Sequence, residues 1–130
     1  MEMEYLLDTH TFLWFISEPE KLGDRARELL IDGENVLYWS AASQWEVSIK
    51  VSLGKLELQD GWQLAFEEER RANFILDLPI RISHCQPTET LPWHHRDPFD
   101  RLLVSQAISE DLTIVSKDKY IRLYDVECVW

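Results

Sequence analysis

The sequence predicts a single α/β domain with a mostly parallel sheet flanked by helices. Short apolar segments that favour strands alternate along the whole chain with longer segments that favour helices. This alternation is typical of consecutive βα units. The chain has 130 residues, of which 45% are hydrophobic, enough for one core. No repeat, low-complexity segment or linker divides it, so we predict one domain over residues 1–130.

The individual elements follow from local patterns. Strands are predicted at 4–7, 36–39, 74–78 and 112–115, with a fifth at 126–129 on the sheet edge. Helices are predicted at 9–17, 24–31, 41–53, around 62–66 and at 98–109. Turn residues separate them: Pro19 follows the first helix, and Gly54 stops the third in the position where a left-handed residue commonly ends a helix. The fourth helix is expected to bury Trp62, Ala65 and Phe66.

Composition narrows the function classes. No apolar run approaches the roughly 20 residues that cross a bilayer, and the N-terminus lacks a signal-peptide pattern. We therefore expect a cytoplasmic protein with no membrane contact, in which Cys85 and Cys128 are free thiols. The formal charge of −11 opposes nucleic-acid binding, because phosphate is repelled by an acidic surface. Nucleic acid remains a candidate only where bound cations reverse the local charge.

Two predicted strands end in acidic residues. Asp8 follows the first strand directly, and Asp118 follows the fourth. In open parallel sheets, sites form beyond the carboxyl ends of the strands. For either residue alone, a turn or helix N-cap is the simpler explanation, because aspartate favours both.

A third acid falls within an apolar helix face. Ala42, Trp45, Ile49 and Leu53 recur at helical spacing and predict the buried stripe of the third helix, and Glu46 lies inside it. An unpaired buried charge is costly. The partner is either Lys50, four residues on in the favourable order, or a metal ion, which we favour; Lys50 can also meet phosphate.

The fourth acid lies near the start of the helix at 98–109. Asp97 is the expected N-cap with Pro98 at the first helical position. Asp100 then occupies a position where an acid often completes a capping box. Leu103, Val104 and Ala107 form the inward face, so we expect Asp100 to point toward the sheet edge rather than to solvent.

Together, four carboxylates could converge at one end of the sheet. They are Asp8, Glu46, Asp100 and Asp118. Such a cluster repels itself unless cations neutralise it. Hard oxygen ligands suit Mg²⁺ or Mn²⁺, one or two ions. These ions support hydrolysis of phosphodiesters by activating water and stabilising the developing charge.

The sequence lacks the motifs of zinc sites, P-loop nucleotide sites and serine hydrolases. His94, His95 and Cys85 do not have zinc-ligand spacing, so we expect the histidines at the surface or behind the acidic residues, with substrate contact as the weaker alternative. No phosphate-binding P-loop and no G-x-S-x-G serine motif is present.

The motifs now indicate a family. The chain resembles PIN-domain proteins, in particular the VapC-like toxins of bacterial toxin–antitoxin pairs. The matching segments, in the family's order and spacing, are Leu7-Asp8-Thr9-His10, residues 43–50, residues 95–103 with Gln106-Ala107, and Val115-Ser116-Lys117-Asp118.

The resemblance implies a five-stranded parallel sheet and Mg²⁺- or Mn²⁺-dependent RNA cleavage. It assigns metal ligation and catalysis to Asp8, Glu46, Asp100 and Asp118, and gives Asp97 and Ser116 supporting positions, Ser116 beside a metal-bound water. We count Lys50 and Arg101 among the supporting cations. The resemblance also implies a small antitoxin partner and a homodimer. The apolar helix at 9–17 suits such burial, unless its aromatic side chains pack within the chain.

Two other functions stay open. One is a metal-dependent phosphatase or nucleotidase, although Asp8-Thr9-His10 lacks the second aspartate of a D-x-D nucleophile motif. The other is a non-catalytic binding module, which the presence of all four acids disfavours. The sequence does not specify which RNA would be cleaved.

Overall fold

The computed structural model describes residues 3–130, so the first two residues of the predicted domain lie outside it. The strands are β1 (Glu4–Leu7), β2 (Val36–Ser40), β3 (Ile75–Leu78), β4 (Thr113–Val115) and β5 (Cys128–Val129). The helices are α1 (Thr9–Ser17), α2 (Asp24–Ile31), α3 (Ala41–Ser52), α4 (Trp62–Ala72), α5 (Ile82–Cys85) and α6 (Pro98–Glu110). Short 3₁₀ turns lie at Pro19–Lys21, Gln86–Glu89 and Ile121–Leu123.

The five strands form one parallel sheet in the order β3-β2-β1-β4-β5. This confirms the predicted fold class. The chain builds the sheet outward from β1 in one direction through β2 and β3, and later in the other direction through β4 and β5. The order therefore reverses between β1 and β4, which is the place where open α/β sheets commonly form a site.

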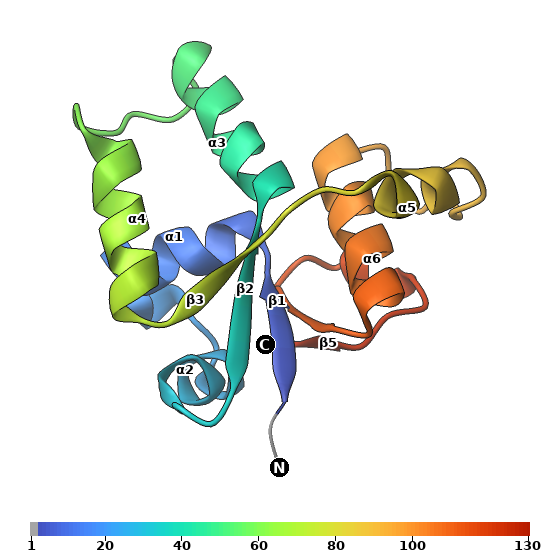
Figure 1. Ribbon diagram of the computed structural model, residues 1–130, viewed down its shortest axis with the longest axis horizontal. Helices are drawn as coiled ribbons and strands as arrows, with labels where there is room; N and C mark the ends of the chain where they lie inside the picture. Colours follow the sequence, from blue (N-terminus) through green and yellow to red (C-terminus); the bar gives the residue numbers. More distant parts are fainter. Residues whose placement is uncertain (1–2) are drawn as a thin grey trace.

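Helices cover both faces of the sheet (Figure 1). Helices α1, α2 and α4 lie on one face, and α5 and α6 lie on the other. The central strand β1 serves both cores, because Tyr5 and Leu7 pack on the first side and Leu6 packs on the second. Helix α3 extends beyond the carboxyl end of β2, beside the N-terminal end of α6 (Figure 1). The carboxyl edge of the sheet is thus enclosed by α1, α3 and α6.

The predicted buried stripe of α3 is confirmed at Ala42 and wrong at Trp45 and Leu53. Trp45 is 59% exposed and Leu53 is 62% exposed, whereas the buried residues are Ala42, Ser43, Glu46 and Val47. The buried face is turned by about one residue, because α3 packs between α1 and α6 rather than flat on the sheet. Glu46 is nevertheless buried, as expected.

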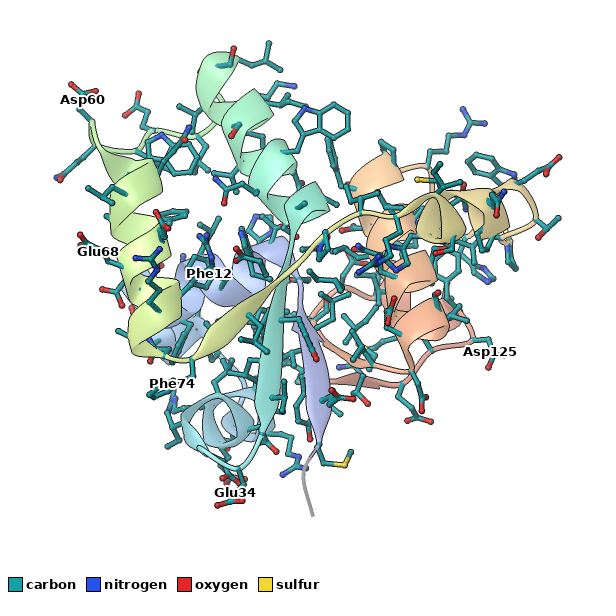
Figure 2. All side chains as sticks on the ribbon, in the orientation of Figure 1. Phe12, Glu34, Asp60, Glu68, Phe74 and Asp125 are labelled. Carbon is teal, nitrogen blue, oxygen red and sulfur yellow. The ribbon has the colours of Figure 1, made fainter. Side chains whose placement is uncertain are left out.

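Two further expectations need correction. Ala65 is exposed, so α4 buries mainly Phe66 with Trp62 partly covered. Phe74 was expected to begin the third strand, but it has a φ of 57°, is 84% exposed and belongs to the turn after α4; Figure 2 shows it at the outside of the fold. A left-handed residue commonly ends a helix, so the strand begins one residue later.

Smaller features agree with the sequence. Gly54 has a φ of 71° and follows the C-cap residue of α3. Both cysteines are free. Within residues 3–130, no helix is long and apolar enough to span a membrane.

Candidate active site

The carboxyl ends of β1 and β4 carry the first two acidic residues. Asp8 follows β1 and is buried, and its carboxylate is the N-cap of α1, where the Thr11 N–H donates to Oδ1 at 2.9 Å. The prediction that Asp8 is an N-cap is confirmed, and the cap uses only one of the two carboxylate oxygens. Burial raises the pKa of the Asp8 carboxyl, against the opposing effect of hydrogen bonds from Ser116 and Thr11.

Ser116 links the two strand ends. Its hydroxyl donates a hydrogen bond to Oδ2 of Asp8 and accepts one from the Asp118 N–H at 3.0 Å. Ser116 is fully buried. This side chain therefore orients Asp8 and fixes the loop that carries Asp118. Its assignment beside a metal-bound water stays a prediction of the resemblance.

Asp118 lies partly exposed at the rim. Its Oδ1 accepts hydrogen bonds from the Tyr120 N–H at 2.7 Å and the Ile121 N–H at 3.3 Å. A pocket of about 250 Å³ opens between Asp8 and Asp118, with His10, Trp14 and Lys117 as its other lining residues. The pocket thus brings two predicted ligands to one opening, with a lysine beside them.

Glu46 enters from α3 and is firmly held. Its Oε1 accepts a hydrogen bond from the Thr9 hydroxyl at 2.6 Å, and its Oε2 lies 2.9 Å from Lys50 Nζ. The Thr9 hydroxyl also lies 2.9 Å from that of Ser43. The sequence allowed two partners for Glu46, a lysine or a metal ion, and the ion pair with Lys50 is present. Thr9 and Ser43 were missed, although both occur inside the matched motifs.

Asp97 and Asp100 begin α6. Asp97 Oδ1 accepts hydrogen bonds from the N–H groups of Phe99 at 2.9 Å and Asp100 at 3.1 Å, which confirms it as the N-cap. Among the described residues, no hydrogen bond of the Asp100 side chain completes a capping box at the start of α6. Its side chain is 17% exposed and lies 3.5 Å from the His95 ring at Nε2.

Electrostatics ties the acids together. Burial raises the pKa of Asp100 to about 8, and the negative charges of Asp97, Asp8, Asp118 and Glu46 add to the rise. All the predicted carboxylates are therefore near enough to repel a charge on Asp100. The four predicted ligands, drawn from four separate elements, form one acidic cluster.

Arg101 has a different environment from the one expected. It is 4% exposed, and its guanidinium donates to the carbonyls of Thr88, Leu91 and Pro92 and to the Tyr124 hydroxyl. It also stacks on Trp93 at 3.7 Å. Because all four of these hydrogen bonds go to the segment before α6 or to Tyr124, Arg101 anchors that segment rather than facing the carboxylates.

The donor set suits Mg²⁺ or Mn²⁺, since carboxylate oxygens are the ligands these ions prefer. Across residues 3–130, no three acidic, histidine or cysteine side chains already stand in an arrangement that could hold an ion. The mutual repulsion felt by Asp100 is the property that a cation would relieve. A bound ion would therefore have to draw these side chains inward from the positions described here.

Sheet, helices and cluster together define the class: an α/β protein whose acidic side chains gather at the point where the strand order reverses. The chain belongs to the PIN-domain family, which it matches over residues 5–127. None of the curated proteins matches the sequence significantly.

Solved structures share the fold. One is VapBC2 from Rickettsia felis bound to a DNA fragment from its promoter, with a TM-score of 0.74 and 16% identity over 98% of each chain. Another is VapBC-1 from nontypeable Haemophilus influenzae, with a TM-score of 0.67 and 19% identity over 98% of this chain and 97% of that one. A third is FitAcB from Neisseria gonorrhoeae, with a TM-score of 0.60 and 21% identity over 97% and 96%. The VapC-like resemblance is confirmed at the level of the fold.

The raised pKa of Asp100 predicts how stability depends on pH. The folded protein keeps a proton on Asp100 up to about pH 8, whereas an unfolded chain releases it near the ordinary value of 3.8. Metal-free protein should therefore lose stability as the pH rises from about 4 to 8. Asp100→Asn cannot ionise, so we expect it to be more stable than the unmodified protein at pH 8 by on the order of 2 kcal/mol, with no gain near pH 4.

Thermal melting in chelator at several pH values measures this difference. Asp60→Asn is the matched control, because it makes the same charge change at an exposed position, which Figure 2 shows at the outside of the fold just before α4. Equal gains for both variants, or a gain for Asp100→Asn that does not change with pH, would contradict the predicted repulsion.

Proposed function

We propose that this protein is a Mg²⁺- or Mn²⁺-dependent endoribonuclease and the toxin of a toxin–antitoxin pair, acting in the cytoplasm. The observation that best supports a hydrolytic site is the cluster of Asp8, Glu46, Asp100 and Asp118, in which burial raises the pKa of Asp100 to about 8 and the charges of the neighbouring acids add to the rise. Membership of the PIN-domain family and a fold shared with VapBC structures support the nuclease and toxin assignments.

The protein's own side chains would divide the work. Asp8 is fixed by Thr11 and Ser116, so it would provide the most rigid ligand. Asp118 and Asp100 lie nearer the surface and would complete the set. Glu46 would join through an oxygen that Thr9 or Lys50 now also contacts.

Bound Mg²⁺ or Mn²⁺, as one or two ions, would activate water and offset the charge that develops on the phosphodiester. Lys117 lines the opening beside Asp8 and Asp118, and its ammonium group would attract the phosphate. These positive charges answer the objection raised by the net charge of −11, because the sign that matters to the substrate is the local one.

The direct test is to incubate the purified protein with mixed cellular RNA and Mg²⁺ or Mn²⁺, with and without chelator. We expect endonucleolytic cleavage that requires the metal. A parallel incubation with mononucleotides measures release of inorganic phosphate. Phosphate release without RNA cleavage would instead establish the phosphatase, and Mn²⁺ binding without either reaction would favour a non-catalytic module.

The antitoxin would contact a groove beside the cluster. A pocket of about 490 Å³ runs between α1, α3 and the segment after α3, and its apolar lining includes Leu13, Trp14, Ile16, Leu56 and Leu58. Phe12 itself packs in the core, whereas Trp14 and Phe15 are only partly buried, so α1 is not fully covered by its own chain. An amphipathic segment with basic residues would match this groove and the acidic opening next to it.

Co-expression with the adjacent gene product tests this partner. We expect growth arrest by the protein alone and relief when both are made. Homodimer formation, implied by the family resemblance, stays a prediction that sedimentation of the free protein would check.

A further inference from the structure

The His95 ring is part of a buried polar chain that ends at the acidic cluster. Its side chain is 11% exposed. The ring stacks on Tyr120 at 5.5 Å with an interplanar angle of 13°, so its plane is defined. Nδ1 lies 2.9 Å from the Tyr124 hydroxyl, and Arg101 Nη1 donates to that same hydroxyl at 3.2 Å.

These contacts determine which ring nitrogen carries the hydrogen. Arginine can only donate, so the Tyr124 oxygen accepts from Arg101 and has one hydrogen of its own to give. Among its partners in the described residues, His95 Nδ1 is the one able to accept that hydrogen. Nδ1 is therefore the acceptor, and in the neutral ring Nε2 carries the hydrogen.

The Nε2–H group faces Asp100. Within residues 3–130 this nitrogen is buried and has no hydrogen-bond partner, but Asp100 Oδ2 lies 3.5 Å from it, slightly beyond a good hydrogen bond. A buried donor without a partner is unfavourable. A small movement of the Asp100 side chain would satisfy it.

We propose that His95 is the positioning residue for Asp100: its Nε2–H, fixed by Tyr124 and Arg101, donates to Oδ2 and leaves the other carboxylate oxygen free for a divalent cation. The role of His95 in metal binding rests on the proposed function, whereas the contacts of its ring do not. Outer partners of this kind orient ligating carboxylates and commonly change metal affinity by about 10–100-fold. Arg101 therefore has a second role, because the guanidinium that anchors the segment before α6 also fixes the tautomer of His95 through Tyr124.

The first test needs neither metal nor activity. Nitrogen NMR of protein labelled at histidine, in chelator and at a pH where the ring is neutral, reports which ring nitrogen is protonated. We expect Nε2–H for His95, a change in its resonance in Asp100→Asn, and no change in the matched control Asp60→Asn. Tyr124→Phe should let the ring populate the other tautomer. A predominant Nδ1–H form in the unmodified protein, or no response to Asp100→Asn, would overturn the inference.

The second test compares two amide substitutions by calorimetric titration with Mn²⁺. Asparagine places its amide near the Nδ1 position, whereas glutamine reaches the Nε2 position. We expect His95→Asn to weaken Mn²⁺ binding by about tenfold or more, and His95→Gln to retain most of the affinity, with both variants shown to be folded by thermal melting. Equal losses would mean that the ring only fills space. If the unmodified protein itself binds no Mn²⁺, the proposed function fails, whereas the NMR result still decides whether His95 holds Asp100.

Discussion

We expect the Asp8→Asn substitution to lower metal-dependent RNA cleavage by about a thousandfold while leaving the fold intact. The asparagine side-chain oxygen can still cap α1, because the Thr11 N–H needs only one acceptor. The negative charge is lost, however, and so is the oxygen that accepts from Ser116. Cleavage rates with saturating Mn²⁺, together with melting curves, measure both effects.

The matched control is again Asp60→Asn, which should cleave like the unmodified protein. If Asp8→Asn retained activity, the nuclease would have to be a contaminant or the site would lie elsewhere. A variant that neither cleaves nor folds would leave Asp8 as a structural cap, and Glu46→Gln, which keeps an acceptor for Thr9, would then carry the comparison.

The second large effect concerns stability. We expect Arg101→Lys to reduce the free energy of unfolding by about 3 kcal/mol. The guanidinium satisfies three carbonyls and the Tyr124 hydroxyl at once and stacks on Trp93. A lysine ammonium is a single point charge that cannot reproduce this planar fork, so the part-buried carbonyls of this segment would lose their donors.

Urea unfolding of Arg101→Lys against Arg25→Lys, an exposed arginine of α2, isolates the role of the fork. Arg25→Lys should change stability by less than about 0.5 kcal/mol. Comparable stability of the two variants would show that Arg101 is dispensable as an anchor.

Much of the sheet was predictable because its signal is local. The apolar strand segments and the helix-capping residues Asp8, Asp97 and Gly54 all act within a few positions of the chain. Strand ends shifted by one or two residues, as with Phe74, where the turn after α4 required a left-handed conformation. The position of the acids at the carboxyl edge followed from the same local reasoning plus the topology of parallel sheets.

Other features depend on tertiary contacts that no local pattern contains. Trp45 fits a helical stripe but packs edge-on against Phe99 from α6 at 5.4 Å, at the surface. The basic residue Arg101 adjoins Asp100 in sequence, yet its donors turn to the segment before α6. The short helix α5 was missed, as was its buried His84, whose ring lies 2.8 Å from Glu110. In each case the partner lies outside the same helix or strand, so periodicity alone gives no indication of it.

The hydrogen bond between Asp8 and Ser116 joins residues 108 positions apart, and β1 has β4 as a neighbour. During synthesis the first strand therefore leaves the ribosome long before the strand that completes its surroundings. Such distant pairing makes folding slow compared with local contacts. A nascent chain would consequently carry Asp8 without its partner, and the proposed metal-binding cluster would be complete only after β4 had been made and inserted.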